Sequence, residues 1–163
     1  MKTLLVLRHA KSSWKNTRLA DFDRPLNKRG KGDAPLMGEL IKKEDIVPDL
    51  IISSAARRAL ATAEAVALAC DYESEIQTTR QIYHGWTDDT IELINGVPDN
   101  YERVMVVGHN PGMESLVEEL TGDWIRMPTA ALAQISLSID HWAELRGDPE
   151  GVLVNSWTPK ELV

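Results

Sequence analysis

The sequence has little of several residue types, and each shortage excludes a class of protein. Its 163 residues include one cysteine, Cys70, and one phenylalanine. A single cysteine excludes a disulfide scaffold and any metal site built from several cysteines. No apolar run approaches the roughly 20 residues of a membrane-spanning helix. The four apolar residues before Arg8 are also too few for the core of a signal peptide, so we expect a soluble, cytoplasmic protein.

What is present is typical of one globular domain. Apolar residues make up 43% of the chain and charged residues 26%, which excludes disordered and fibrous classes. A chain of this length buries a core without help from disulfides or a structural metal. We find no repeat, linker or low-complexity tract. The sequence therefore predicts a single domain over residues 1–163.

The charge of the chain is unevenly distributed. The net charge is −7, yet residues 1–31 hold nine Lys or Arg and only two acids, Asp21 and Asp23. An acidic protein is a poor nucleic-acid binder, because phosphate contacts dominate such affinity. A local basic lobe suits a single anionic group in a pocket, although a solvated N-terminal surface explains the charge alone equally well.

Short apolar runs alternate with longer amphipathic stretches. Continuous apolar runs over 3–8, 49–54 and 103–108 predict strands buried on both faces, whereas helical spacing marks 29–44, 54–70 and 111–120, and more weakly 87–95. The third of these helices is expected to begin with Asn110 as N-cap and Pro111 as its first residue. The segments 130–139 and 151–157 predict two antiparallel or edge strands. The pattern predicts an α/β three-layer sandwich around a mainly parallel sheet flanked by helices.

Histidine and arginine follow the ends of the three buried strands. Arg8 and His9 end the first, Ser53 and Ser54 lead from the second to Arg57 and Arg58, and Gly108-His109-Asn110-Pro111-Gly112 ends the third. Ligands of open α/β sheets bind beyond the carboxyl ends of the strands. A lone histidine there is usually structural, and a lone arginine pair is a solvated helix start. Because histidine or arginine follows all three strand ends, the sequence predicts a functional site at this edge of the sheet instead.

These residue types suit phosphoryl transfer through a histidine. A neutral imidazole attacks phosphorus, and guanidinium groups match the equatorial oxygens of the transferred group. A second histidine across the phosphate adds a hydrogen-bond donor, and the amides that begin the third helix favour an anion. The Gly-Lys-Gly segment at 30–32 lacks the spacing of a nucleotide-binding loop, which argues against ATP binding.

At the level of motifs, the sequence resembles the histidine phosphatase superfamily, which has the phosphoglycerate-mutase-like fold. The resemblance rests on "RHA" at 8–10, "SSAARRALAT" at 53–62 and "GHNPG" at 108–112. The segment 8–30, "RHAKSSW…DFDRPLNKRG", is similar to the small bacterial branch of phosphohistidine phosphatases. The resemblance extends through nearly the whole chain.

Residue by residue, the resemblance implies roles for four side chains. His9 corresponds to the nucleophile that accepts the phosphoryl group, and Arg8, Arg58 and His109 correspond to the phosphate pocket. Arg24 is a further phosphate-binding candidate, with an ion pair to Asp21 or Asp23 as the equal alternative. No cofactor is implied, and the sequence offers no carboxylate cluster for a metal beside these residues, so we expect metal-independent activity.

The sequence departs from the family pattern at two places. Ala10 replaces the usual glycine, which is tolerable if the backbone there keeps a negative φ. The proton donor is the second departure, because Asn110 replaces the aspartate of one branch and no glutamate matches that of another. One histidine and three acids nearby are candidates, although an ordinary surface or helix-start role explains each of them better: His84, Asp88, Asp89 and Glu92.

The sequence therefore predicts a phosphatase that uses a covalent phosphohistidine intermediate. The leading substrate is phosphohistidine in a protein, and a small-molecule phosphate ester is the alternative. A third hypothesis is a catalytically inactive module that binds phosphorylated proteins. The presence of all four site residues disfavours it: Arg8, His9, Arg58 and His109. The expected partner is a phosphorylated protein or small phosphate compound, with no nucleic acid and no membrane involved.

Overall fold

The computed structural model describes residues 1–147 and 151–162. The strands are β1 (Lys2–Arg8), β2 (Leu50–Ser54), β3 (Ile76–Thr79), β4 (Arg103–Gly108), β5 (Leu132–Leu137) and β6 (Gly151–Trp157). The α-helices are α1 (Lys28–Lys43), α2 (Arg57–Ala69), α3 (Gln81–His84), α4 (Thr87–Asn95) and α5 (Gly112–Thr121). The described residues also include three 3-10 helices: η1 (Asp21–Asp23), η2 (Trp142–Glu144) and η3 (Pro159–Leu162).

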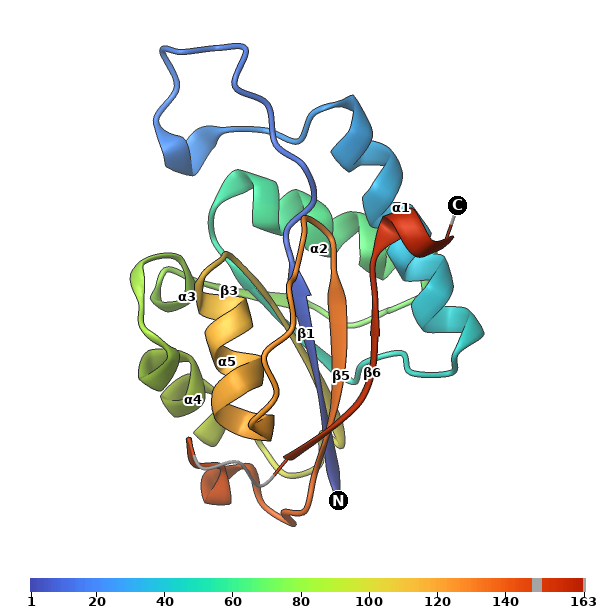
Figure 1. Cartoon of the computed structure of the whole chain (residues 1–163), viewed down its shortest axis with the longest axis vertical. Helices are drawn as coiled ribbons and strands as arrows, with labels where there is room; N and C mark the ends of the chain where they lie inside the picture. Colours follow the sequence, from blue (N-terminus) through green and yellow to red (C-terminus); the bar gives the residue numbers. More distant parts are fainter. Residues whose placement is uncertain (148–150, 163) are drawn as a thin grey trace.

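One six-stranded sheet forms the middle layer of the molecule (Figure 1). Its order is β3-β2-β4-β1-β5-β6, in which the first four strands are parallel and β5 and β6 are antiparallel to their neighbours. The predicted α/β architecture with a mainly parallel sheet is confirmed. No helix in the described ranges is long and apolar enough to cross a membrane.

The central strand β1 is buried on both faces, as its continuous apolar run predicts. Leu4 and Val6 belong to a core cluster with residues of α4 and α5, and Leu5 and Leu7 belong to a second cluster with residues of α1 and α2. Each such side chain stabilises the fold by roughly 1.5–3 kcal/mol when it is fully buried. The Arg8-His9 pair therefore lies at the end of a strand that is packed on both faces.

Two local predictions were wrong or incomplete. Asn110 does not cap α5, because its side-chain amide donates to the Met127 carbonyl (2.8 Å) and the helix begins at Gly112 after Pro111. The edge strand β3 and the short helix α3 were not predicted. β3 is only four residues long, and none of them is fully buried, so it lacks the apolar run that marks the central strands.

The loop that follows His9 is held close to the first turn of α1. A Cβ atom on Gly30 would lie 2.1 Å from the Lys11 carbonyl oxygen, so only a glycine allows this approach. The Gly30 amide also donates to the Asn27 side chain (2.9 Å), which caps the helix. Gly32 lies in the same helix and is exposed, with nothing within 4 Å of its Cβ position.

These two glycines give a matched pair of substitutions. We expect Gly30→Ala to lower stability by about 1–3 kcal/mol, because the Lys11 backbone has to move. Gly32→Ala is expected to raise stability by about 0.5–1 kcal/mol, because alanine is the better helix residue. Thermal unfolding followed by circular dichroism measures both, at about 2–4 °C per kcal/mol for a chain of this size. Equal melting temperatures for the two variants would contradict the close approach.

Candidate active site

The pairing of β1 with β4 brings the two sequence-predicted histidines together. Arg8 lies opposite Gly108 in the parallel register, and the His9 amide donates to the Gly108 carbonyl (3.0 Å). His9 and His109 are therefore the next residues on two adjacent strands. Their ring centroids are 5.1 Å apart. The ends of parallel strands thus place both imidazoles at one edge of the sheet, as predicted.

The His9 ring is held in one tautomer. Its Nδ1 atom lies 2.7 Å from the Ala10 carbonyl oxygen, which accepts hydrogen bonds only, so Nδ1 carries the proton and Nε2 keeps its lone pair. Burial lowers the pKa of His9 to about 4, opposed by this hydrogen bond and assisted by the charges of Arg58 and Arg8. The ring is consequently neutral at pH 7, and the lone pair on Nε2 is free to attack an electrophile.

The His109 ring is likewise neutral. Burial, together with the neighbouring His9 and Arg58, lowers its pKa to about 3. Its Nε2 lies 2.7 Å from the Ser54 hydroxyl, whose oxygen accepts a hydrogen bond from the Ala56 amide (3.2 Å). A proton donated by that hydroxyl to Nε2 places the remaining ring proton on Nδ1. Ser54, at the end of β2, therefore orients a ring carried by β4.

Ala10 replaces glycine without strain. It is fully buried and does not belong to the residues with positive φ. Its amide donates to the Thr62 hydroxyl (2.9 Å), which in turn donates to the Arg58 carbonyl (2.7 Å). The "SSAARRALAT" segment thus supports the loop that follows His9 as well as supplying an arginine.

The two consecutive arginines of α2 separate as expected, because neighbouring helical residues do not share a face. Arg57 is exposed, whereas Arg58 is buried and turned towards the histidines. Two of its nitrogens donate to Asp21, one to the backbone carbonyl (2.8 Å) and one to the carboxylate (3.0 Å).

Asp21 is the residue that connects the basic groups, and sequence reasoning considered it only as a partner of Arg24. Its carboxylate accepts hydrogen bonds from Arg24 (3.1 Å), Arg58 (3.0 Å) and the Tyr83 hydroxyl (2.7 Å). Partial burial alone would raise the pKa of Asp21, but the hydrogen bonds from Tyr83 and Arg58 lower it to about 2. Asp21 therefore remains ionised throughout the neutral range and holds the loop 10–27 against α2 and α3.

Arg24 makes the ion pair that the sequence left as an alternative. Its guanidinium is buried, donates to the Ser12 hydroxyl (2.8 Å) as well as to Asp21, and lies under the exposed ring of Trp14, with its central carbon 3.4 Å from the ring centroid. Its charge also acts on His9, whose pKa it helps to lower. Arg24 thus organises the loop and adds positive potential to the site.

Three buried nitrogens at this edge of the sheet have no hydrogen-bond partner. Within the described residues they are Nε of Arg8, Nε of Arg58 and Nδ1 of His109. Buried polar groups are nearly always satisfied, and an orphaned donor costs about 1–3 kcal/mol. Unpaired donors on three separate elements beside His9 therefore point to a bound anion as their missing partner.

The four proton-donor candidates are placed differently. His84 contacts the edge of Tyr83, with ring centroids 4.3 Å apart, and lines a cavity of about 330 Å³ that His109 also lines. The Asp89 carboxylate accepts from the Trp86 amide (2.7 Å) and caps α4. Asp88 lines a different hollow, and Glu92 lies on an exposed part of α4. The structure thus brings only His84 of the four near the histidine pair.

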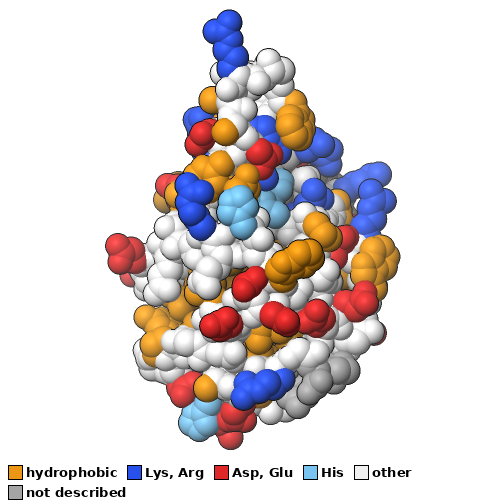
Figure 2. Space-filling view, turned by 90° about the vertical axis from the view of Figure 1, so that its left-hand side faces the viewer, with side chains coloured by type: hydrophobic (Ala, Val, Ile, Leu, Met, Phe, Trp, Pro, Cys, Tyr) orange, Lys and Arg blue, Asp and Glu red, His pale blue; other side chains and the backbone are white. Residues whose placement is uncertain are grey.

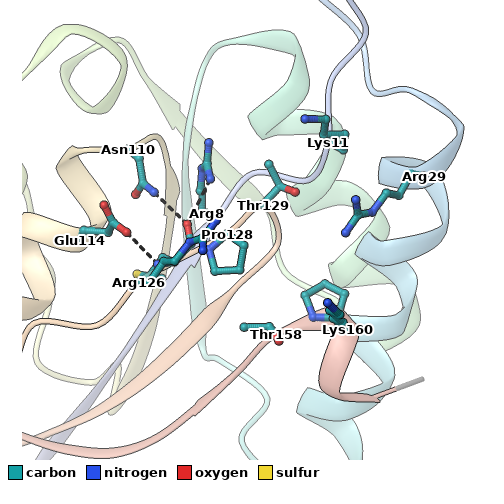
Figure 3. Close-up of a pocket in the computed structure, with 12 residues that line it drawn as sticks. Arg8, Lys11, Arg29, Asn110, Glu114, Arg126, Pro128, Thr129, Thr158 and Lys160 are labelled. Atoms are coloured by element: carbon teal, nitrogen blue, oxygen red, sulfur yellow. Dashed lines mark hydrogen bonds between the residues drawn. The ribbon is translucent and has the colours of Figure 1, made fainter.

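Beside the histidines lies a second, larger cavity of about 650 Å³ (Figure 3). Arg8 and Asn110 line it, together with side chains from the loop after β1, from α1, from 126–129 and from η3. Figure 2 shows Lys and Arg gathered around histidine in the upper part of one face, above a band of Asp and Glu. In the described part of the chain, no three His, Cys, Asp or Glu side chains are grouped so as to hold a metal ion.

Comparison with known proteins agrees with these motifs. The model of the histidine phosphatase superfamily (branch 1) matches residues 4–115. An uncharacterised chloroplastic protein of Arabidopsis thaliana is 30% identical over 152 residues, covering 88% of this chain and 70% of that protein.

Solved structures show the same fold. A structure described as a candidate phosphohistidine phosphatase SixA from Agrobacterium tumefaciens has a TM-score of 0.83 and 28% identity, covering 97% of this chain and 98% of that one. A structure of the protein histidine phosphatase SixA with tungstate has a TM-score of 0.85 and 22% identity, covering 99% of both chains.

The buried His9, the half-buried His109 and the exposed His141 give a test of these electrostatics. An ion pair with Asp99 raises the pKa of His141. As the pH falls from 8, we therefore expect His141 to take up its proton first, whereas His9 stays neutral until about pH 4. Nitrogen-15 NMR of the imidazoles measures the order and the tautomer. Because the unfolded chain protonates His9 near its ordinary pKa, stability is lost as the pH falls from about 6.5 towards 4. A His9 resonance that titrates together with His141 would contradict this description.

Proposed function

Because the chain belongs to the histidine phosphatase superfamily, branch 1, we propose that it hydrolyses phosphohistidine in proteins through a covalent intermediate on His9. The observation that carries the proposal is the set of three unpaired buried nitrogens, on Arg8, Arg58 and His109, around a neutral His9. The likeness to the candidate phosphohistidine phosphatase of Agrobacterium tumefaciens supports the substrate class.

In the proposed first step, the lone pair on Nε2 of His9 attacks phosphorus. The hydrogen bond from Nδ1 to the Ala10 carbonyl supports this step, because it stabilises the positive charge that the ring acquires. The N–P bond to His9 forms while the bond between phosphorus and the leaving imidazole breaks. The leaving ring departs neutral, once its other nitrogen has been protonated, and this substrate therefore needs little help from an acid of the enzyme.

The charge on the transferred phosphoryl group is balanced by groups that are already in place. Arg8 and Arg58 offer their unpaired Nε–H groups, and His109 offers Nδ1–H from a ring that Ser54 orients. Asp21 holds the other two nitrogens of Arg58, so the guanidinium does not reorganise during the reaction. Water then attacks phosphorus in line, the bond to Nε2 breaks, and inorganic phosphate and neutral His9 are released.

The covalent intermediate is tested by rapid quench with a phosphorus-32-labelled substrate. We expect an acid-labile, base-stable label on the wild-type protein and none on His9→Ala. Asn110→Ala is a useful comparison, because Asn110 donates to the Met127 carbonyl and is not assigned to the reaction. Label that persists on His9→Ala would rule out His9 as the nucleophile. Tungstate should inhibit competitively, and EDTA should leave the rate unchanged.

The absence of an assigned acid predicts a strong dependence on the leaving group. General acid catalysis contributes about 10²–10⁴ in rate, and alkoxides leave poorly without it. We expect high activity on phosphohistidine, moderate activity on phosphates of acidic phenols and very little on phosphoserine. Across a series of aryl phosphates, log(kcat/KM) should fall steeply as the pKa of the phenol rises.

A flat series would instead show that the enzyme has a proton donor. His84 is the first residue to substitute in that case, because it shares a cavity with His109. His84→Gln would then steepen the dependence, whereas Glu92→Gln, on the exposed part of α4, serves as the control. If a donor is lacking, both variants keep the slope of the wild type.

A further inference from the structure

The cavity of about 650 Å³ beside the histidines is larger than the transferred group requires. Five of the residues that line it are basic, and we call this the cationic cavity: Arg8, Lys11, Arg29, Arg126 and Lys160. Neither His9 nor His109 lines it. The cationic cavity therefore extends from the phosphate site through Arg8, and most of its charge lies outside the reach of the phosphoryl group that His9 would accept.

Most of these charges have no carboxylate partner. Arg29 pairs with Asp33 (3.5 Å), whereas across residues 1–147 and 151–162 no ion pair involves Lys11, Arg126 or Lys160. Among the residues that the structure describes, the one acid that lines the cationic cavity is Glu114, and its carboxylate accepts a hydrogen bond from the Met127 amide (2.8 Å). An acidic protein with a net charge of −7 thus keeps several basic side chains around one hollow.

The walls of the cationic cavity come from segments far apart in the sequence. Lys11 follows the nucleophile's strand, Arg29 belongs to α1, and Lys160 belongs to η3. Figure 3 shows Lys11 and Arg29 across the cavity from Arg8 and Arg126.

The segment that carries Arg126 is held in place. The Met127 carbonyl accepts from Arg8 (3.1 Å) and from Asn110 (2.8 Å), and the Met127 amide is bound by Glu114. The position of Arg126 is therefore tied to the same arginine that offers its Nε–H to the phosphate.

We propose that the cationic cavity binds a second anionic group of the substrate, a carboxylate or phosphate, beside the phosphoryl group that is transferred to His9. This inference rests on the proposed function, since it assigns a specificity to the same site. Lys11 and Arg8 both line the cationic cavity, and at most about 11 Å of extended chain separates them, so the second anion would lie beside the phosphate site. Such a group is supplied either by an Asp or Glu side chain beside the phosphohistidine of a protein or by a second acid on a small phosphate ester.

The double variant Arg126→Gln/Lys160→Gln removes two charges of the cationic cavity and leaves His9, Arg8, Arg58 and His109 in place. Lys31→Gln/Lys43→Gln is the matched control, because both lysines are exposed on α1 and neither lines the cavity. Each protein is assayed on two matched pairs of substrates. One pair is a phosphohistidine peptide with flanking Glu or with Gln in its place. The other pair is 4-carboxyphenyl phosphate and its neutral amide, 4-carbamoylphenyl phosphate.

We expect the wild type and the control to prefer the acidic member of at least one pair by about tenfold in kcat/KM. Exposed ion pairs contribute roughly 1.5- to 5-fold each, so the double variant should lose most of this preference while keeping its rate on the neutral members. The preference should also fall in 1 M salt, where the Debye length is about 3 Å. A preference confined to the peptides identifies a protein as the source of the anion, and one confined to the aryl pair identifies a small ester.

Equal kcat/KM values for acidic and neutral members in the wild type would overturn the inference, as would a preference that the double variant retains. Binding of the same four compounds to His9→Ala, measured by calorimetry, separates this result from a failure of the proposed function. A protein that turns over none of them but binds the acidic members more tightly, through Arg126 and Lys160, would refute the phosphatase and support the second anion site.

Discussion

The parallel pairing of β1 with β4, with Arg8 opposite Gly108, is the constraint on which the candidate site depends. It places His9 and His109 one residue beyond paired positions. Their rings therefore lie next to each other because of the strand pairing itself. The two core clusters pack against opposite faces of β1 and β4, and thereby fix the positions of both rings at the ends of these strands. A slip of one residue between these strands would move one ring by about 3.3 Å and turn it to the other face.

A second layer of organisation is electrostatic and depends on Asp21. Three or more basic groups close together would repel one another and leave the loop 10–27 without a fixed position. The Asp21 carboxylate opposes this repulsion by binding Arg24, Arg58 and Tyr83 at once. Burial is the main reason why both imidazoles stay unprotonated, and the positive charge of Arg58 and Arg8 lowers their pKa values as well. Asp21 therefore fixes the positions of the basic groups, while burial sets the protonation state of the histidines.

Much of this arrangement is predictable from the sequence because it follows from strand ends. Continuous apolar runs mark β1, β2 and β4, and the residues directly after them are Arg8-His9, Ser53-Ser54 and Gly108-His109. The features of the site that the sequence did not predict depend on contacts between segments that are distant in the chain. Tyr83 lies on a short helix after the poorly marked strand β3, and no local pattern connects it with Asp21, 62 residues away. Asn110 was misassigned for the same reason, since its partner Met127 lies 17 residues further along.

The stacking of Trp14 on Arg24 has an optical consequence. The indole is 70% exposed, and its ring faces a guanidinium that is bound by the same carboxylate as Arg58. Trp142, by contrast, is wholly buried in the core on the other side of the sheet from α1 and α2. An anion bound beside Arg58 would alter the electric field across the Trp14 indole, and the emission wavelength of an indole depends on that field. Binding of an anion at the proposed site is therefore expected to shift the fluorescence of Trp14.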